Sequence, residues 1–163
     1  MTQYHLTGAD EATTILLSFP TTTPLNLPHQ QSQAIAMTHL RVSTDPGWKN
    51  SAGPAVRIQG TKGEIQVDGP VFRPLRYRVI PSQPEDSPPV PIRQVDIPLR
   101  DNEKGLYFEA DEAARCIRDG KLQSDIMPWE ESIVIMEVMD EVRRQGGLTY
   151  PGNIESTVWP LQP

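Results

Sequence analysis

Apolar and polar residues alternate along the first part of the chain, which is the pattern of β-strands with one buried face. The segment 12–19 is rich in β-branched and apolar residues and ends at Pro20. In the segment 55–69, two alternating runs flank Gly60 and Gly63, which predicts a hairpin. Further strands are predicted at 34–43, 71–80 and 92–99, and polar, proline-rich loops at 20–33 and 81–91.

The period of the apolar positions changes from two to about 3.6 residues after these strands. Residues 107–119 have apolar side chains at helical spacing, and Gly120 supplies a stop. Residues 127–147 form a second helical segment. Its apolar stripe consists of Ile135, Val138, Met139 and Val142.

The ends of this second helix are also specified by the sequence. Pro128 suits the first turn, and the two glutamates that follow it complement the positive end of the helix dipole. Gly146 and Gly147 follow the last turn, where glycine commonly ends a helix. Asp140 and Arg144 are spaced for an i,i+4 ion pair.

In this chain the predicted strands come first and the predicted helices follow. This order predicts an α+β fold, with an open, mostly antiparallel sheet and the C-terminal helices packed on one face. Strands do not alternate with helices, and no G-x-G-x-x-G sequence links a strand to a helix, so no Rossmann domain is expected in this chain. The length of 163 residues predicts one domain, 1–163, with a core at about 8–151 and a tail at 152–163.

Composition narrows the classes of partner. The net charge is −6, the pI is about 5.0, and the 15 basic residues are scattered, which argues against nucleic acid and anionic membranes. The single cysteine, Cys116, fits a reducing compartment and is expected to be a small buried side chain. No apolar run reaches the roughly 18 residues of a membrane span, so we expect a cytoplasmic protein.

The sequence contains few candidates for catalytic or ligand-binding residues. Three histidines, His5, His29 and His39, lie far apart and lack the spacing of metal ligands. The glycines Gly60 and Gly63 join two strands rather than opening a helix, so a turn is favoured over a phosphate loop. We therefore expect no catalytic residue, no metal site and no cofactor bound by this chain.

A set of residues occurs in a fixed order within 105–151. It comprises a glycine, an aromatic residue followed by Glu-Ala, a helix ending in glycine, a serine, a proline, and a helix of the form E-S-x-x-x-M-x-x-x-D-x-x-R. In order, these residues are Gly105, Phe108, Glu109, Ala110, Gly120, Ser124, Pro128, Glu131, Ser132, Met136, Asp140 and Arg143. Together with the hairpin GTKGEIQV at 60–67, this set closely resembles the C-terminal domain of the glucose–fructose oxidoreductase/inositol dehydrogenase/MocA superfamily.

The resemblance is strongest to the branch of dimeric dihydrodiol dehydrogenase and NADP-dependent D-xylose dehydrogenase. It implies an oxidoreductase that uses NADP or NAD to take hydride from a D-xylose-like sugar or a trans-dihydrodiol. It also implies that this domain forms the wall of the substrate pocket and the dimer face. The loop before Gly105 borders that pocket in relatives, which makes Arg100 a candidate for substrate binding, with a solvated loop arginine as the alternative.

Several family motifs are absent from the sequence. These are the glycine-rich cofactor fingerprint, the E-K-P motif and the early helix of the C-terminal domain with its acid–base residue. In family terms the chain begins just after that helix, so we expect Met1 to correspond to an internal methionine and the chain to be a truncated product or fragment. The isolated chain is therefore predicted to be catalytically inactive.

Two other functions stay open at this point. The chain could be a non-catalytic binding or assembly module that pairs through its open sheet with another copy or with a full-length paralogue. The P-x-x-P sequences of PSQPEDSPPVP (81–91) could serve as ligands for proline-binding domains.

Overall fold

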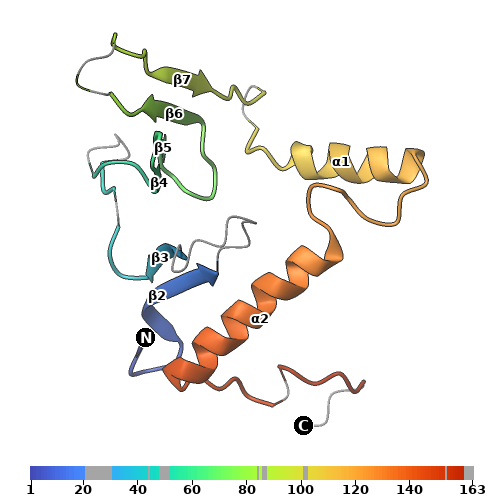
Figure 1. The fold of residues 1–163 in the computed structure, drawn as a ribbon. Coiled ribbons are helices and arrows are strands. Elements are labelled where there is room, and N and C mark those ends of the chain that lie inside the picture. The colour runs from blue at the N-terminus through green and yellow to red at the C-terminus, as the bar shows by residue number, and fades with distance from the viewer. Residues whose placement is uncertain are drawn as a thin grey trace. The chain divides into compact units, whose positions relative to one another are not determined.

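The chain divides into two compact units in a computed structural model of the protein (Figure 1). The first unit comprises Met1–Ser43 and Ile126–Pro163, and the second comprises Thr44–Asp125. The structure describes residues 1–20, 31–43, 45–47, 52–83, 85, 88–100, 103–152 and 154–159. Much of the predicted loop at 20–33 and part of the predicted loop at 81–91 lie outside these residues.

The first unit contains a three-stranded antiparallel sheet in the order β1-β2-β3. The strands are β1 (Thr2–Gln3), β2 (Asp10–Pro20) and β3 (Gln31–His39). The two strands predicted here are confirmed with shifted ends, since β2 is longer than 12–19 and β3 begins three residues before position 34. The short strand β1 was not predicted, because two residues are too few to show alternation.

The register of β2 and β3 assigns their side chains to two faces. Thr13 pairs with Thr38 and Ile15 with Ala36 on one face, whereas Leu16 pairs with Ile35 on the other. Thr13 is buried and Ile15 and Leu17 are half-buried, while Leu16 is exposed. The alternation seen in the sequence therefore separates a covered face from an open one.

Helix α2 (Trp129–Gly146) lies over the covered face of this sheet. It begins after Pro128, which is the capping residue rather than part of the first turn. Gly147 has φ 67° and ψ 23°, and the N–H of Leu148 donates to the carbonyl of Arg143 at 3.0 Å. This is the glycine-ended arrangement that satisfies the last carbonyls of a helix, so the predicted stop is confirmed at Gly147, whereas Gly146 is still part of the helix.

The ion pair predicted within α2 forms with different partners. Arg144 pairs with Glu141 at 2.5 Å, and Asp140 pairs with Arg143. Both pairs are three residues apart, which is the other spacing that brings helical side chains together. The predicted apolar stripe is also only partly covered, since Val138 and Val142 are half-buried but Ile135 and Met139 are exposed.

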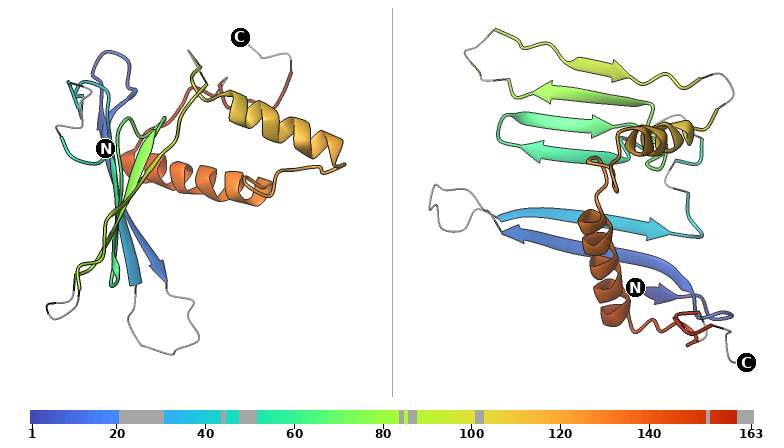
Figure 2. Two further views of the ribbon diagram at one scale, coloured as in Figure 1. Left: turned by 90° about the horizontal axis from the view of Figure 1, so that it is seen from above. Right: turned by 90° about the vertical axis from the view of Figure 1, so that its right-hand side faces the viewer.

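The second unit contains a four-stranded antiparallel sheet in the order β4-β5-β6-β7, which Figure 2 shows from two further sides. The strands are β4 (Val56–Gly60), β5 (Gly63–Val67), β6 (Arg76–Pro81) and β7 (Arg93–Asp96). The predicted hairpin is confirmed, with Gly60 opposite Gly63. Residues 71–75, which were predicted to be part of a strand, are not in β6.

The two faces of this sheet differ in chemistry. Ile58, Ile65 and Val79 lie side by side on one face. The other face carries charged and amide side chains. Its ion pairs include Arg57–Glu64 at 2.5 Å, Arg76–Asp96 at 2.6 Å and Arg78–Asp68 at 2.6 Å. Because Asp68 is buried, its pair with Arg78 is the one that solvent screens least.

Helix α1 (Tyr107–Arg118) follows β7. Gly120 has φ 67°, and the N–H of Lys121 donates to the carbonyl of Cys116 at 2.8 Å, so this helix ends in the same way as α2. Cys116 is buried, as expected. The α+β class and the open antiparallel sheets are confirmed, but the described strands form two sheets rather than one.

Candidate functional site

Arg100 lies between β7 and α1 and contacts two side chains of α1. Its Nη2 atom lies 3.2 Å from Oδ2 of Asp111, and its Cζ atom lies 4.1 Å from the centroid of the Tyr107 ring. Residues 107 and 111 are one helical turn apart, so both partners project from the same face of α1. The helix therefore determines where the guanidinium of Arg100 lies.

The Arg100 side chain and the rings beside it can still bind a ligand. The side chain of Arg100 is 59% exposed, and a guanidinium has five N–H donors, of which the ion pair uses one. The rings of Tyr107 and Phe108 have centroids 4.3 Å apart, and Phe108 is exposed. A charged donor, a carboxylate and apolar ring faces in one place are groups that can bind a polyhydroxylated molecule. The sequence identified Arg100 as a candidate but did not show its contacts with Tyr107 and Asp111.

Of the three histidines considered as candidates, His5 and His39 make separate local contacts. His5 packs its ring against Tyr4, and the Nδ1 atom of His39 accepts a hydrogen bond from the backbone N–H of Arg41 at 3.1 Å. His29 lies outside the described residues. Within the part of the chain that the structure describes, no cluster of three or more His, Cys, Asp or Glu residues could hold a metal ion.

Glu112 links α1 to the segment that follows it. The Ser124 hydroxyl donates to Oε1 of Glu112 at 2.7 Å, and this bond is the main reason that the pKa of Glu112 lies below its usual value. The thiol of Cys116 lies 3.7 Å from the same oxygen. Burial and then the nearby charge of Glu112 raise the pKa of Cys116, so it stays a thiol rather than becoming a nucleophilic thiolate.

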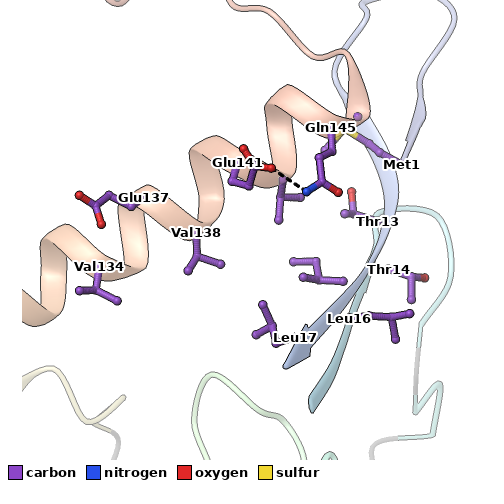
Figure 3. A pocket seen from close by; sticks show the side chains of 13 residues that line it. Met1, Thr13, Thr14, Leu16, Leu17, Val134, Glu137, Val138, Glu141 and Gln145 are labelled. Carbon is purple, nitrogen blue, oxygen red and sulfur yellow. Dashed lines mark hydrogen bonds between the residues drawn. The ribbon is translucent and has the colours of Figure 1, made fainter. Parts of the chain in front are cut away.

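A cavity of about 590 Å³ lies between β2 and α2 in the first unit (Figure 3). Its wall on the strand side includes Thr13, Ile15 and Leu17. The residues from α2 are Val134, Glu137, Val138, Glu141, Val142, Gln145 and Gly146, and Met1 lies at the end of the cavity near Gln145. We call this cavity the α2–β2 groove.

Some polar groups of the α2–β2 groove have hydrogen-bond partners and others do not. Glu141 accepts hydrogen bonds from Arg144 at 2.5 and 2.6 Å and from Gln145 at 2.7 Å. The bonds from Arg144, followed by that from Gln145, lower the pKa of Glu141 to about 2. Thr13 is 5% exposed, and its hydroxyl has no hydrogen-bond partner. The groove therefore contains one paired carboxylate and one unsatisfied hydroxyl.

Known proteins match nearly the whole chain. It is 47% identical over 161 residues to a D-xylose 1-dehydrogenase (NADP(+)) of Hypocrea jecorina, which covers 95% of this chain. A human trans-1,2-dihydrobenzene-1,2-diol dehydrogenase is 29% identical over 148 residues, which are 90% of the chain. A scyllo-inositol 2-dehydrogenase (NADP(+)) of Bacillus subtilis is also 29% identical, over 146 residues and 90% of the chain. These relatives are the dehydrogenases of the glucose–fructose oxidoreductase/inositol dehydrogenase/MocA superfamily that the sequence pattern resembles.

The chain spans a minor share of these relatives. It covers 37% of the fungal dehydrogenase, 38% of the human one and 36% of the bacterial one. No family model and no solved structure match the chain. In the described residues, neither helix is both long enough and apolar enough to cross a membrane.

Proposed function

We propose that this chain is the substrate-side and dimerisation domain, 1–163, of a cytoplasmic NADP-dependent oxidoreductase that takes hydride from a D-xylose-like sugar. The 47% identity to a D-xylose 1-dehydrogenase over 95% of the chain carries the proposal. A trans-dihydrodiol is the alternative substrate class, supported by the 29% identity to a trans-1,2-dihydrobenzene-1,2-diol dehydrogenase. NADP binds to the part of the enzyme that this chain does not span, so the isolated chain has no turnover.

Arg100 is the residue that we propose for contact with substrate hydroxyls. Its guanidinium is held by Asp111 and by the Tyr107 ring, so little side-chain freedom is lost when it binds a ligand. Its free N–H groups can donate to hydroxyl oxygens, which suits a sugar better than an apolar substrate. In this proposal Arg100 orients the substrate, and NADP, when bound by the rest of the enzyme, would supply the hydride acceptor.

A chimera tests the proposal. The matching 37% of the Hypocrea jecorina dehydrogenase is replaced by this chain, and NADPH formation is measured with D-xylose and with trans-dihydrobenzenediol. We expect turnover with D-xylose. A folded chimera that binds NADP but oxidises neither substrate would overturn the assignment of this chain as a substrate-side domain.

A second candidate function is a non-catalytic assembly module. The open face of the first sheet carries three exposed apolar side chains that are neighbours across the strands: Leu16 (76%), Ile35 (69%) and Met37 (77%). This face could pair with another copy or with a full-length paralogue. Sedimentation of the pure chain tests this function, and a monomer at all concentrations, with no binding to a full-length relative, would contradict it.

A further inference from the structure

The second unit exposes a proline-rich sequence, PPVPIR at 88–93, that the proposed function does not use. Of the two P-x-x-P sequences in 81–91, the first begins at the last residue of β6, and its second proline, Pro84, lies outside the described residues. The second runs from Pro88 to Pro91 and lies in neither a helix nor a strand. Every residue of 88–93 is exposed, so this segment is accessible to a partner.

The local sequence favours an extended backbone in this segment. Proline holds φ at about −65°, and a residue that precedes proline is pushed to extended ψ values. Pro88, Pro89 and Pro91 meet the first condition, and Pro88 and Val90 meet the second. These preferences are those of a polyproline II helix, which rises about 3.1 Å per residue with three residues per turn. In such a helix Pro88 and Pro91 lie on one edge, about 9 Å apart.

The side chain of Gln83 holds this segment from the other end of the loop. Its amide nitrogen donates to the carbonyl of Val90 at 2.8 Å, and its oxygen accepts from the Val90 N–H at 2.9 Å. Val90 has the one backbone N–H of 88–91, because the other three residues are prolines. With that donor occupied, 88–91 has no N–H with which to join a partner's sheet. Its proline rings and side chains are the groups left for recognition.

Arg93 adds a positive charge at the end of the segment. It is the first residue of β7, the edge strand of the second sheet, and its backbone pairs with that of Val79. Arg93 is exposed and forms no ion pair within the described residues, in contrast to Arg76 and Arg78 on the neighbouring strand. A guanidinium binds a carboxylate through two parallel N–H groups. An arginine two positions after a P-x-x-P sequence therefore suits a proline-binding groove that ends in acidic residues.

We propose that 88–93 is a docking site for an SH3-type domain, with Pro88 and Pro91 against its aromatic-lined groove and Arg93 against acidic residues at the end of that groove. The prolines and the Gln83 contact already restrict the segment, so little conformational entropy is lost on binding. An SH3-type domain is favoured over other proline-binding domains, because the charge of Arg93 needs a complementary acidic pocket. The docking site is independent of the proposed function, since none of its residues contributes to the contacts of Arg100.

Binding to the folded chain tests this docking site. The probes are purified SH3 domains that bind P-x-x-P-x-R peptides, and each is titrated calorimetrically into the full 163-residue chain. We expect saturable binding that Pro91→Ala and Arg93→Ala each weaken about tenfold or more. Pro98→Ala and Arg118→Ala change an exposed proline and an exposed arginine elsewhere in the same unit, and should leave the affinity unchanged. The inference is overturned if no probe binds, or if either Pro91→Ala or Arg93→Ala leaves the affinity unchanged.

A synthetic peptide of residues 85–95 separates recognition from folding. It contains the docking segment without Gln83 and carries the same two substitutions, so the test does not depend on how the variant chains fold. We expect the chain to bind more tightly than the peptide, and Gln83→Ala to weaken binding by the chain about two- to fivefold, because the segment is no longer held. A peptide that binds while the folded chain does not would overturn the inference, since the fold would then hide the segment.

Salt dependence tests the role of the charge separately. Added salt screens an exposed ion pair, so it should weaken binding of the wild-type chain more than binding of Arg93→Ala. Equal salt dependence of the two chains would show that Arg93 meets no acidic pocket and would overturn the assignment to an SH3-type domain.

Discussion

The guanidinium carbon of Arg100 lies 4.1 Å from the centroid of the Tyr107 ring, while Asp111 holds one nitrogen of the same group at 3.2 Å. The two contacts act on different parts of the side chain. The ring restrains the plane of the guanidinium, and the carboxylate restrains its direction. An exposed arginine is in this way oriented before any ligand arrives.

Loss of this orientation should weaken substrate binding more than it weakens catalysis. We expect Tyr107→Leu in the chimera to raise KM for D-xylose about two- to fivefold with little change in kcat, because an exposed cation–π contact is worth about 0.5–1 kcal/mol. Arg100→Ala should raise KM further. Steady-state kinetics check both, and Arg118→Ala, at an exposed arginine in the same unit, is the control. An unchanged KM in both variants would show that Arg100 does not contact the substrate and is a solvated loop residue.

The hairpin turn should not tolerate a side chain at Gly63. Its φ is 135°, and an added Cβ would lie 2.2 Å from the carbonyl oxygen of Ile80 and 2.8 Å from the Cα of Pro81. We expect Gly63→Ala to lower the free energy of unfolding by at least about 2 kcal/mol, seen as a loss of about 4 °C or more in Tm. Gly60→Ala is the control, because its Cβ would meet only one backbone oxygen at 3.7 Å. Similar melting of both variants would contradict the turn geometry.

The pair of Asp68 and Arg78 should contribute more to stability than the exposed pair on the same face. Asp68 is buried, and the Nε atom of Arg78 already lacks a partner, so Asp68→Asn would leave a partly buried positive charge without its counter-ion. We expect a loss of about 1–3 kcal/mol. Asp96→Asn, which breaks the exposed pair with Arg76, should cost less than about 1 kcal/mol. Urea unfolding of the two variants measures the difference, and equal losses would show that burial does not distinguish them.

The stability that Glu141 contributes should depend on pH in a defined window. Its pKa falls from 4.5 to about 2 in the folded chain, because Arg144 and Gln145 bind the ionised carboxylate. A depressed folded-state pKa gives stability that is present above pH 4.5 and lost as the pH falls to about 2. We therefore expect the wild type to exceed Glu141→Gln in stability at pH 6 and the difference to shrink between these values. A difference that is constant from pH 6 to pH 2 would exclude this linkage.

The local elements could be predicted from the sequence because their signals are local. The alternation in 12–19, the glycines at 60 and 63, and the glycines that end both helices each determine the conformation of a few neighbouring residues. The division into two sheets could not be predicted in this way. Alternation identifies a strand and its faces, but it does not say which strand lies beside which.

The partners of individual charged side chains also could not be predicted from the sequence. The prediction of Asp140 with Arg144 used one of two allowed helical spacings, and the structure uses the other. Arg100 was found through its place before Gly105 in the family pattern. Its partners Tyr107 and Asp111 required the path of the chain between β7 and α1, which spacing alone does not give.

The most direct measurement of the central claim is the rate of NADPH formation by the chimera, compared with the isolated chain and with the parent fungal dehydrogenase. All three are assayed with NADP and D-xylose, after NADP binding by the chimera has been verified. We predict turnover by the chimera that requires D-xylose, and none by the isolated chain. A chimera that is folded and binds NADP but oxidises neither D-xylose nor a trans-dihydrodiol would contradict the claim that this chain supplies the substrate side of a dehydrogenase.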